Sequence, residues 1–306
     1  MSARSYIVFQ AYGNEDILRE CLFALLTFSR FHPAGVPADT ELWIYTDRED
    51  WFGQFADCPL PLRFRRVDAA LVREWRGELD FVHRMKIEVL RDFVKNRNGA
   101  VLYLDTDVCF LDSVAGILAH IHDGALYMHV QESIIRDEAN PLLRKLHRFL
   151  LRNSPLSVNG RTLTVPADTA MWNAGVLGFH TDRAPLLDAV LALSDSIYRQ
   201  FPKHVTEQFA FSFYFQQTAP VRSSAAHVLH YWNFKEMRAY LQSFFAYFRD
   251  TPWQELSRYT ALIQPHVPLQ EMISFYRSRS CWDKLRRKSW QPPSPDWPSL
   301  LEQMQQ

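Results

Sequence analysis

Short apolar runs alternate with stretches of helical periodicity between residues 6 and 120. Apolar and β-branched runs predict strands, and apolar residues spaced by three or four, as at Ile17, Cys21, Leu25 and Phe28, predict helices. The predicted strands are residues 6–11, 42–46, 62–67 and 101–104, and the predicted helices are residues 16–31, 81–95 and 113–120. This alternation predicts an α/β fold with a mixed, mostly parallel sheet flanked by helices.

The second half of the chain continues this pattern with longer insertions. It predicts helices at residues 136–152, with a basic face, and at residues 185–201 and 207–217, and strands at residues 171–179 and 228–232. Residues 153–165 are rich in turn-forming residues, residues 236–288 are aromatic and helical, and residues 292–298 are rich in proline. We therefore predict one α/β domain over residues 1–235 and a helical aromatic extension over residues 236–306 that packs on it.

Two carboxylates interrupt the most apolar of these strands. Residues 101–104 are followed by Asp105, Thr106 and Asp107, and then by the apolar residues 108–110. Aspartates one residue apart at the end of a buried strand repel each other and lose hydration unless a cation or another partner compensates. A divalent cation removes both costs, and a nucleoside diphosphate is its usual companion. The alternative is a solvated turn in which one Asp caps the next helix.

Composition narrows the class of protein. A chain of 306 residues with 47% hydrophobic residues and 10 glycines predicts an ordered globular protein with a sizeable core. Lys and Arg number 34, as do Asp and Glu, so the net charge is zero and no overall field attracts nucleic acid or an anionic bilayer. Any anionic ligand must therefore be held by a local site.

Cysteine spacing and the N-terminal residues bear on location. Cys21, Cys58, Cys109 and Cys281 are far apart and form no Cys-x-x-Cys pair, which disfavours a zinc module or a disulfide framework and favours a reducing cytoplasm. The apolar stretch near the N-terminus is too short for a signal peptide, and no apolar run reaches the roughly 18 residues of a membrane span.

Polar residues also follow two other predicted strands. Tyr12 follows residues 6–11, and Asp47 follows residues 42–46. Because ligands of α/β sheets bind beyond the carboxyl ends of the strands, we expect both residues to face the same crevice as the Asp105 and Asp107 pair.

An ordered set of short segments between residues 6 and 235 resembles the GT-A glycosyltransferases. Within them it is similar to the retaining family that includes glycogenin and bacterial lipooligosaccharide galactosyltransferases, a family 8-like pattern. The matching segments are Ala11-Tyr12, Thr46-Asp47, the helix carrying Lys86, Leu104-Asp105-Thr106-Asp107, Trp172-Asn173-Ala174-Gly175-Val176, Thr206-Glu207-Gln208 and His230-Tyr231. The resemblance implies a GT-A fold and a metal-dependent hexosyltransferase that moves a sugar from a nucleoside-diphosphate sugar, with UDP as the expected nucleotide, to an acceptor hydroxyl on a glycan, a glycolipid or another molecule.

The resemblance also implies a role for each matching residue. Asp105, Asp107 and His230 would bind Mn²⁺ or Mg²⁺, and an imidazole ligand favours manganese. The residues placed at the donor sugar, as catalytic residues, are Asn173, Glu207 and Gln208. The residues placed at the nucleotide and its phosphates are Ala11, Tyr12, Asp47, Lys86, Thr106 and Lys235.

Several of these residues have a plainer interpretation when taken alone. Lys86 also fits a solvated helix face, Asp47 a turn at a strand end, and Glu207 an acidic residue in the first turn of a helix.

The third metal ligand has competitors in His227 and His266. Residues 227 and 230 face opposite sides of a strand, so only one can share the metal, and the Tyr231 that follows favours His230, as in the family. Relatives continue with Gly and then Lys-Pro-Trp, whereas this chain has Lys235 one position early and lacks the Pro-Trp pair.

Other chemistries remain open at this level. A haloacid-dehalogenase-like phosphatase would use Asp105 as the nucleophile on a phosphoryl group, although Cys109 stands where Thr or Val is usual and no later pair of acids is evident. A non-catalytic relative that binds a nucleotide sugar is a second alternative. Retention of anomeric configuration needs no separate base, whereas inversion requires a carboxylate such as Glu207 or Asp168 to take the proton of the acceptor.

The last third of the chain allows two interpretations. It is rich in aromatic residues, including Phe244, Phe245, Tyr247, Phe248, Trp253, Trp282 and Trp290, and it carries a basic run at residues 284–288. A packed helical cap with a solvated basic turn explains both features. A peripheral membrane contact that brings the protein to a lipid-linked acceptor is the alternative.

Overall fold

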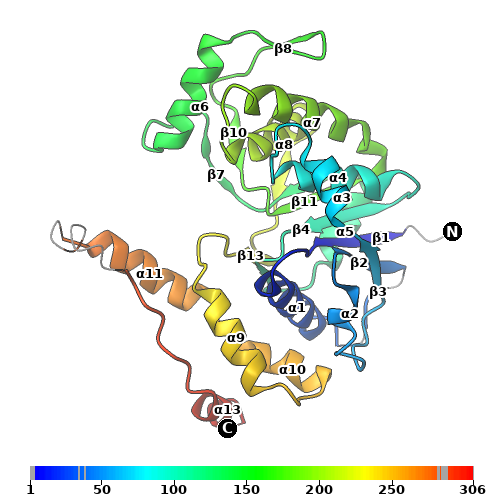
Figure 1. Cartoon of the computed structure of the whole chain (residues 1–306), viewed down its shortest axis with the longest axis vertical. Helices are drawn as coiled ribbons and strands as arrows, with labels where there is room; N and C mark the ends of the chain where they lie inside the picture. Colours follow the sequence, from blue (N-terminus) through cyan, green and yellow to red (C-terminus); the bar gives the residue numbers. More distant parts are fainter. Residues whose placement is uncertain (1–3, 34, 38, 281–282, 284–288, 306) are drawn as a thin grey trace.

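A mixed seven-stranded sheet lies at the centre of the described part of the chain (Figure 1). The computed structural model describes residues 4–33, 35–37, 39–280, 283 and 289–305. The strands, in their order across the sheet, are β12 (Val221–Ser223), β6 (Leu126–Met128), β11 (Val176–His180), β4 (Ala100–Leu104), β1 (Ser5–Gln10), β2 (Thr40–Thr46) and β3 (Leu62–Arg66). Strand β11 is antiparallel to both neighbours, and all other neighbouring pairs are parallel, which confirms the predicted mixed, mostly parallel sheet.

The two faces of the sheet are covered by two hydrophobic cores. Alternate residues of β1 enter different cores, with Ile7 and Phe9 on one face and Tyr6 and Val8 on the other, as the period of two in a strand requires. The first face is covered by α1 (Glu15–Arg30), α5 (Ala115–His122) and the C-terminal helices, and the second by α4 (Arg84–Val94), α7 (Pro185–Tyr198) and α8 (Val205–Thr218). Because both faces are covered, every residue of β4 is buried.

Two predicted elements have different boundaries from those expected. The helix expected from residue 136 begins at Pro141 as α6 (Pro141–Arg152), because the Asn140 side chain accepts hydrogen bonds from the amides of Leu142 and Leu143. Residues 136–140, which were expected to begin the helix, instead form the connection that follows β7 (Gln131–Ile134), a strand that pairs with β10 (Ala170–Trp172). The turn-rich residues 153–165 contain a small hairpin, β8 (Leu156–Val158) and β9 (Arg161–Leu163).

The single strand predicted at residues 171–179 is in fact two strands, β10 and β11. The chain leaves the extended path at Asn173, whose side-chain oxygen accepts a hydrogen bond from the amide of Gly175 at 2.9 Å. The Asn173 backbone bonds instead to the loop of His129 and Val130. This interruption separates the small β7–β10 pair from the central sheet and turns the Asn173 side chain toward the carboxyl end of β4.

Several short elements were not predicted, because they contain too few residues for a periodic pattern to be recognised. They include α2 (Glu49–Phe52), α3 (Ala69–Arg76), β5 (Val108–Phe110) and the 3₁₀ turns Thr181–Arg183 and Thr260–Leu262. Strand β5 pairs antiparallel with β13 (Val228–His230), the strand expected at residues 228–232.

The C-terminal helices pack on the α1 side of the sheet (Figure 1). They are α9 (Met237–Tyr247), α10 (Trp253–Tyr259), α11 (His266–Ser278) and α13 (Trp297–Gln305), the last of which begins inside the segment expected to be only proline-rich. Phe244, Phe248, Trp253 and Trp290 are buried in the core that also contains α1. These four aromatic residues therefore belong to a packed cap, whereas the domain boundary near residue 235 stays a prediction.

Part of the sequence interpretation falls outside the described residues. Cys281, Trp282 and the basic run at residues 284–288 are among the residues that the structure does not describe. Within the described part, no helix has both the length and the apolarity needed to cross a bilayer.

Candidate functional site

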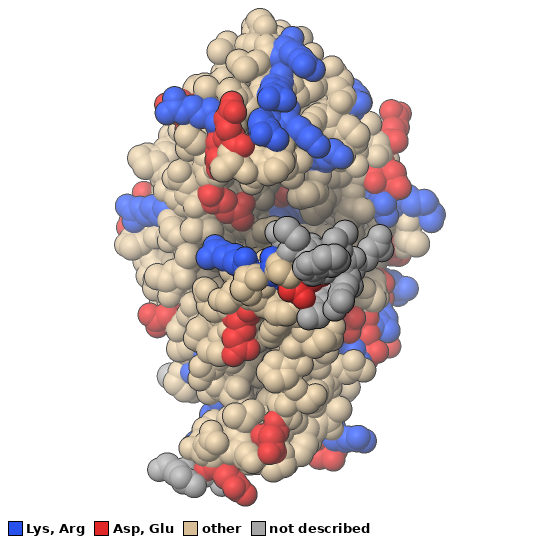
Figure 2. All heavy atoms as spheres, turned by 90° about the vertical axis from the view of Figure 1, so that its left-hand side faces the viewer, with Lys and Arg blue, Asp and Glu red and all other residues tan. Residues whose placement is uncertain are grey.

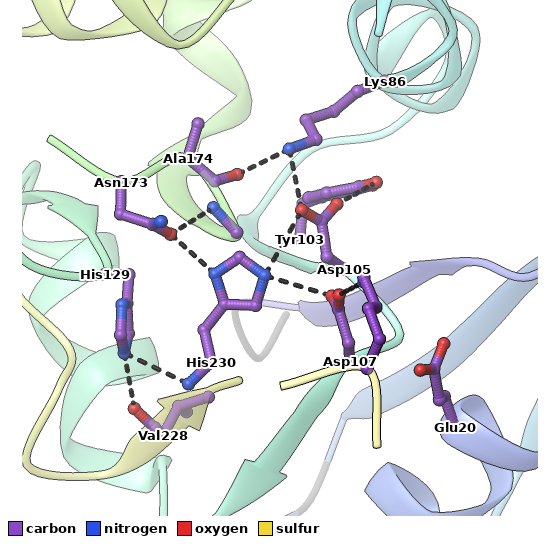
Figure 3. Close-up of polar contacts among 12 residues, drawn as sticks. Glu20, Lys86, Tyr103, Asp105, Asp107, His129, Asn173, Ala174, Val228 and His230 are labelled. Atoms are coloured by element: carbon purple, nitrogen blue, oxygen red, sulfur yellow. Dashed lines mark hydrogen bonds and ion pairs between the residues drawn. The ribbon is translucent and has the colours of Figure 1, made fainter. Parts of the chain in front are cut away.

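Two strand pairings bring Asp105, Asp107 and His230 together. The β4–β11 ladder continues one step past the strand, where the Asp105 amide donates to the Gly175 carbonyl at 2.8 Å. The β5–β13 pair places His230 opposite Val108, directly after Asp107. One ligand atom from each of Asp105, Asp107 and His230 lies within 4.8 Å of the other two (Figure 3). The three side chains thus form a group that can hold a divalent metal ion.

The imidazole of His230 is held at both nitrogens. Its Nδ1 lies 2.7 Å from Asn173 Oδ1, and its Nε2 lies 3.0 Å from Asp107 Oδ1 (Figure 3). Because Asn173 Oδ1 also accepts from the Gly175 amide, it is an oxygen acceptor, and His230 Nδ1 must be the donor. His129 packs edge-on against the ring, with centroids 5.6 Å apart. The arrangement directs Nε2 at the two carboxylates, as expected for a histidine that binds metal through Nε2.

The carboxylates of the group are paired with lysines. Lys86 Nζ lies 3.0 Å from Asp105 Oδ2, and Lys235 Nζ lies 2.9 Å from Asp107 Oδ2. Burial raises the pKa of Asp107, but the hydrogen bond and charge of His230 and the charge of Lys235 outweigh it and hold that pKa below its usual range. The donor set, two carboxylates and one imidazole, fits a divalent cation.

Lys86 is a buried part of this network. Its Nζ donates to Asp105 and to the Ala174 carbonyl at 2.8 Å, and it lies 3.4 Å from Glu207 Oε1. Burial by itself lowers the pKa of Lys86. The negative charges of Asp105 and Glu207 raise it by more than burial lowers it, so the pKa of Lys86 is above its usual value. The interpretation of Lys86 as part of a solvated helix face is therefore wrong.

The carboxyl groups of Glu207 and Asp105 both lie close to the ammonium group of Lys86. The side chain of Glu207 is almost fully buried in the first turn of α8, and burial raises its pKa to about 7. The other carboxylate, Asp105, is closer to Lys86 and also accepts a hydrogen bond from the Tyr103 hydroxyl at 3.0 Å. Its raised pKa allows the Glu207 carboxyl to gain a proton near neutral pH.

These residues line a cavity of about 590 Å³, a size typical of small-molecule sites. The predicted site residues in its wall are Lys86, Asp105, Asp107, Asn173, Glu207, Gln208, His230 and Lys235. The exposed carboxylate of Glu132 ties two of them together, since it accepts from Asn173 Nδ2 and from Gln208 Nε2, each at 2.9 Å.

Four predicted nucleotide contacts are not part of that wall: Ala11, Tyr12, Asp47 and Thr106. Asp47 accepts a hydrogen bond from the Gly13 amide at 3.1 Å and so joins the carboxyl ends of β1 and β2. Tyr12 lies beside this contact, and burial raises the pKa of its hydroxyl. Asp105 and Asp107 line this cavity, whereas the expectation that Tyr12 and Asp47 face the same crevice stays a prediction.

The structure also distinguishes between the residues that the sequence left as alternatives for the third metal ligand and for a catalytic base. His227 Nδ1 contacts the Ser113 carbonyl at 2.7 Å and is absent from the metal-binding group, and His266 begins α11. Asp168 is exposed in the segment before β10 and does not belong to the described cavity wall. Among these side chains, His230 and Glu207 are the ones placed at the site.

Sequence reasoning missed several residues of the site. Tyr103 has the pattern of a core strand residue, and Glu132 lies in a short strand with no distinctive pattern. His83, His204 and the half-exposed Trp232 also line the cavity. The position of Tyr103 two residues before Asp105, on the strand that ends just before the carboxylates, was a local signal that could have identified it.

Comparisons with known proteins give structural likeness only. No protein-family model matches the chain, and no curated protein matches it in sequence. The galactosyltransferase LgtC in complex with donor and acceptor sugar analogs is 14% identical, with 68% of this chain and 70% of that chain covered and a TM-score of 0.46. An active-site mutant of LgtC is 16% identical, with the same two coverages and a TM-score of 0.46.

A third solved structure is mouse xyloside xylosyltransferase 1 in its apo form. It is 12% identical, with 72% of this chain and 84% of that chain covered and a TM-score of 0.47. The chain is thus similar in structure to glycosyltransferases at low identity, and its function has to be argued from the side chains of its own site.

Proposed function

We propose that this protein is a metal-dependent glycosyltransferase that moves a sugar from a nucleoside-diphosphate sugar, with UDP as the nucleotide, to an acceptor hydroxyl. The observation that supports the proposal is the convergence of Asp105, Asp107 and His230 in one cavity with Asn173, Glu207 and Gln208. A group that holds a divalent cation beside polar and carboxyl side chains suits a substrate with a diphosphate at one end and a sugar at the other.

In this proposal Asp105, Asp107 and His230 hold Mn²⁺ or Mg²⁺. The bound metal would act as a Lewis acid that stabilises the charge on the departing nucleoside diphosphate. Asn173 would orient His230 through Nδ1. Lys235, which is half exposed and bonded to Asp107, is free to turn toward a diphosphate once a metal neutralises that carboxylate.

Lys86 and the residues of α8 would define the sugar end of the cavity. Lys86 orients Asp105 from inside the protein and presents its charge to the cavity wall. Asn173, Glu207 and Gln208 would surround the donor sugar, and Ala11, Tyr12, Asp47 and Thr106 would contact the base and ribose at the carboxyl ends of β1, β2 and β4.

We propose retention of anomeric configuration, because neither carboxylate considered for inversion is well placed to take the proton of the acceptor. Asp168 lies outside the described cavity wall, and the buried carboxyl of Glu207 lies 3.4 Å from Lys86 Nζ. A glycan or glycolipid acceptor and a cytoplasmic location are proposed with this reaction.

A thermal-shift panel of nucleotide sugars, each with and without Mn²⁺, tests the proposal. We expect one UDP-sugar to stabilise the wild-type protein only when Mn²⁺ is present, and we expect Asp107→Asn to abolish this effect. NMR of the product anomer would then show whether configuration is retained. Indifference of the protein to every nucleotide sugar would contradict the proposal.

Two outcomes would support the other chemistries. Release of phosphate from a simple phosphomonoester without any nucleotide would point to a phosphatase that uses Asp105 as its nucleophile. Binding of a UDP-sugar without hydrolysis or transfer to any acceptor would point to a non-catalytic relative.

A further inference from the structure

Helix α6 carries a row of cations on its outer face. Arg144, Lys145, Arg148 and Arg152 are half exposed or exposed, whereas Leu143, Leu146 and Leu150 are buried against the protein. Among the described residues, none of the four cations forms an ion pair with Asp or Glu, in contrast to Arg84, Arg91 and Arg238.

The spacing of these cations concentrates their charge. Arg144, Arg148 and Arg152 follow one another at four-residue intervals and span about 12 Å along the helix. Lys145 and Leu151 fall within the same arc of about 120°. Like charges four residues apart destabilise a helix, so this row costs stability unless an external anion compensates it.

Leu151 adds an apolar contact to the same face. It is 62% exposed, more than any other large hydrophobic residue among those described. Blue Lys and Arg atoms gather at the top of the face drawn in Figure 2, at the end of the molecule where Figure 1 places α6. Helix α6 lies at this projecting end of the molecule, and none of its four cations lines the cavity of the site.

We propose that the outer face of α6, defined by Arg144, Lys145, Arg148, Leu151 and Arg152, docks on an anionic lipid bilayer. An exposed row of cations with one exposed leucine fits a surface of phosphate headgroups with an apolar layer beneath. The charge is local, because the whole chain has no net charge. A soluble polyanion would use the cations but gain nothing from Leu151.

The location of this face relative to the cavity suggests what docking achieves. The N-cap residue Asn140 and the first-turn residues Leu142 and Leu143 of α6 belong to the cavity wall, and the cations begin at the next residue. Docking through α6 would hold that wall close to the headgroups. If the proposed transfer reaction is correct, its acceptor is then a hydroxyl of a lipid-linked molecule, but the docking itself does not depend on that reaction.

Vesicle sedimentation tests the proposal without any enzyme assay. We expect the full chain to sediment with phosphatidylcholine vesicles that contain phosphatidylglycerol, to remain in solution with phosphatidylcholine alone, and to be released by salt. Because each cation contributes on the order of fivefold to binding, Lys145→Glu/Arg148→Glu/Arg152→Glu should lose at least about a hundredfold. Leu151→Asn should lose several-fold.

The matched control is Arg63→Glu/Arg66→Glu/Arg73→Glu, which makes the same change of charge at three exposed arginines of β3 and α3. It should retain most of the vesicle binding, and thermal melts show whether both triple variants are folded. The milder Lys145→Gln/Arg148→Gln/Arg152→Gln replaces the first variant if it does not fold.

Three results would overturn the docking proposal. They are no binding of the wild-type protein to anionic vesicles at low salt, an equal loss in the control variant, and equally tight binding to soluble polyphosphate together with no effect of Leu151→Asn.

Discussion

The backbone of Gly175 lies directly against the imidazole ring of His230. A Cβ atom added at Gly175 would overlap Nδ1 and Cε1 of that ring, far inside van der Waals contact. The same glycine accepts the Asp105 amide through its carbonyl and donates its own amide to Asn173. A residue without a side chain is therefore required where β11 begins, because one backbone segment supports two members of the proposed metal-binding group.

Substitution Gly175→Ala should displace His230 and weaken metal binding. We expect Mn²⁺ to raise the melting temperature of the wild-type protein and to raise that of the variant little or not at all. Gly116→Ala is the control, since Gly116 lies in helix α5 with open space around its Cα, and alanine there should be neutral or stabilising by about 0.5–1 kcal/mol. Equal Mn²⁺ shifts in wild type and Gly175→Ala would show that His230 is not a ligand.

Removal of the Asn173 side chain should weaken metal binding without removing a ligand. Asn173 holds His230 through Nδ1, and loss of such a supporting partner costs about 10–100-fold in metal affinity. Isothermal titration of Asn173→Ala with Mn²⁺ measures this change. Gln208→Ala is the control, because Gln208 contacts the same Glu132 carboxylate, is absent from the metal-binding group and should leave Mn²⁺ affinity unchanged.

Substitution Glu207→Gln should change how the stability of the metal-free protein depends on pH. In the wild type, burial raises the pKa of Glu207 from 4.5 to about 7, so the folded state keeps a proton that the unfolded state has released between these values. The stabilising contribution of this carboxyl is present below about pH 4.5 and is lost as the pH rises through about 7, a change on the order of 3 kcal/mol.

The Glu207→Gln variant lacks this loss, so its stability relative to wild type should increase as the pH rises from about 4.5 to 7. Urea unfolding at several pH values measures the difference. Gln208→Ala changes the same wall without removing a titratable group and should follow the wild type. Parallel curves for wild type and Glu207→Gln would mean that Glu207 stays ionised in the folded protein.

The ion pair between Glu20 of α1 and Arg238 of α9 should be important for stability. The Glu20 side chain is 2% exposed, and Arg238 Nε lies 2.9 Å from its Oε1. Arg238→Met leaves this carboxylate buried without its cation, which should destabilise the protein by about 3 kcal/mol. The double variant Glu20→Gln/Arg238→Met should recover part of the loss in urea unfolding, because it removes the unpaired charge.

The control for this pair is Arg258→Met, at an exposed arginine on α10, which should change stability by no more than about 0.5 kcal/mol. If Arg238→Met were as stable as this control, the α1–α9 contact would contribute little to holding the C-terminal helices on the sheet.

The sequence alone predicted strands β1 to β4, the longer helices and the position of the Asp105 and Asp107 carboxylates, but not β6 and β12 of the central sheet. These features are local: a period of two or three to four residues encodes which face of an element is buried, and Asp105 and Asp107 interrupt an apolar strand whose burial is evident from residues 101–104 alone. Elements that depend on caps or pairing were less accessible, as shown by the later start of α6 at Pro141 and by the break between β10 and β11.

Only the tertiary structure decided which distant residues meet. The β5–β13 register selects His230 over His227, and the β4–β11 ladder places Gly175 beside Asp105. The tertiary structure also shows that Lys86 is buried between two carboxylates and that Tyr12 and Asp47 lie outside the wall of the described cavity. Strand register and helix packing bring together residues that are far apart in the sequence, such as Asp105 and His230, and these contacts leave no periodic pattern in the sequence.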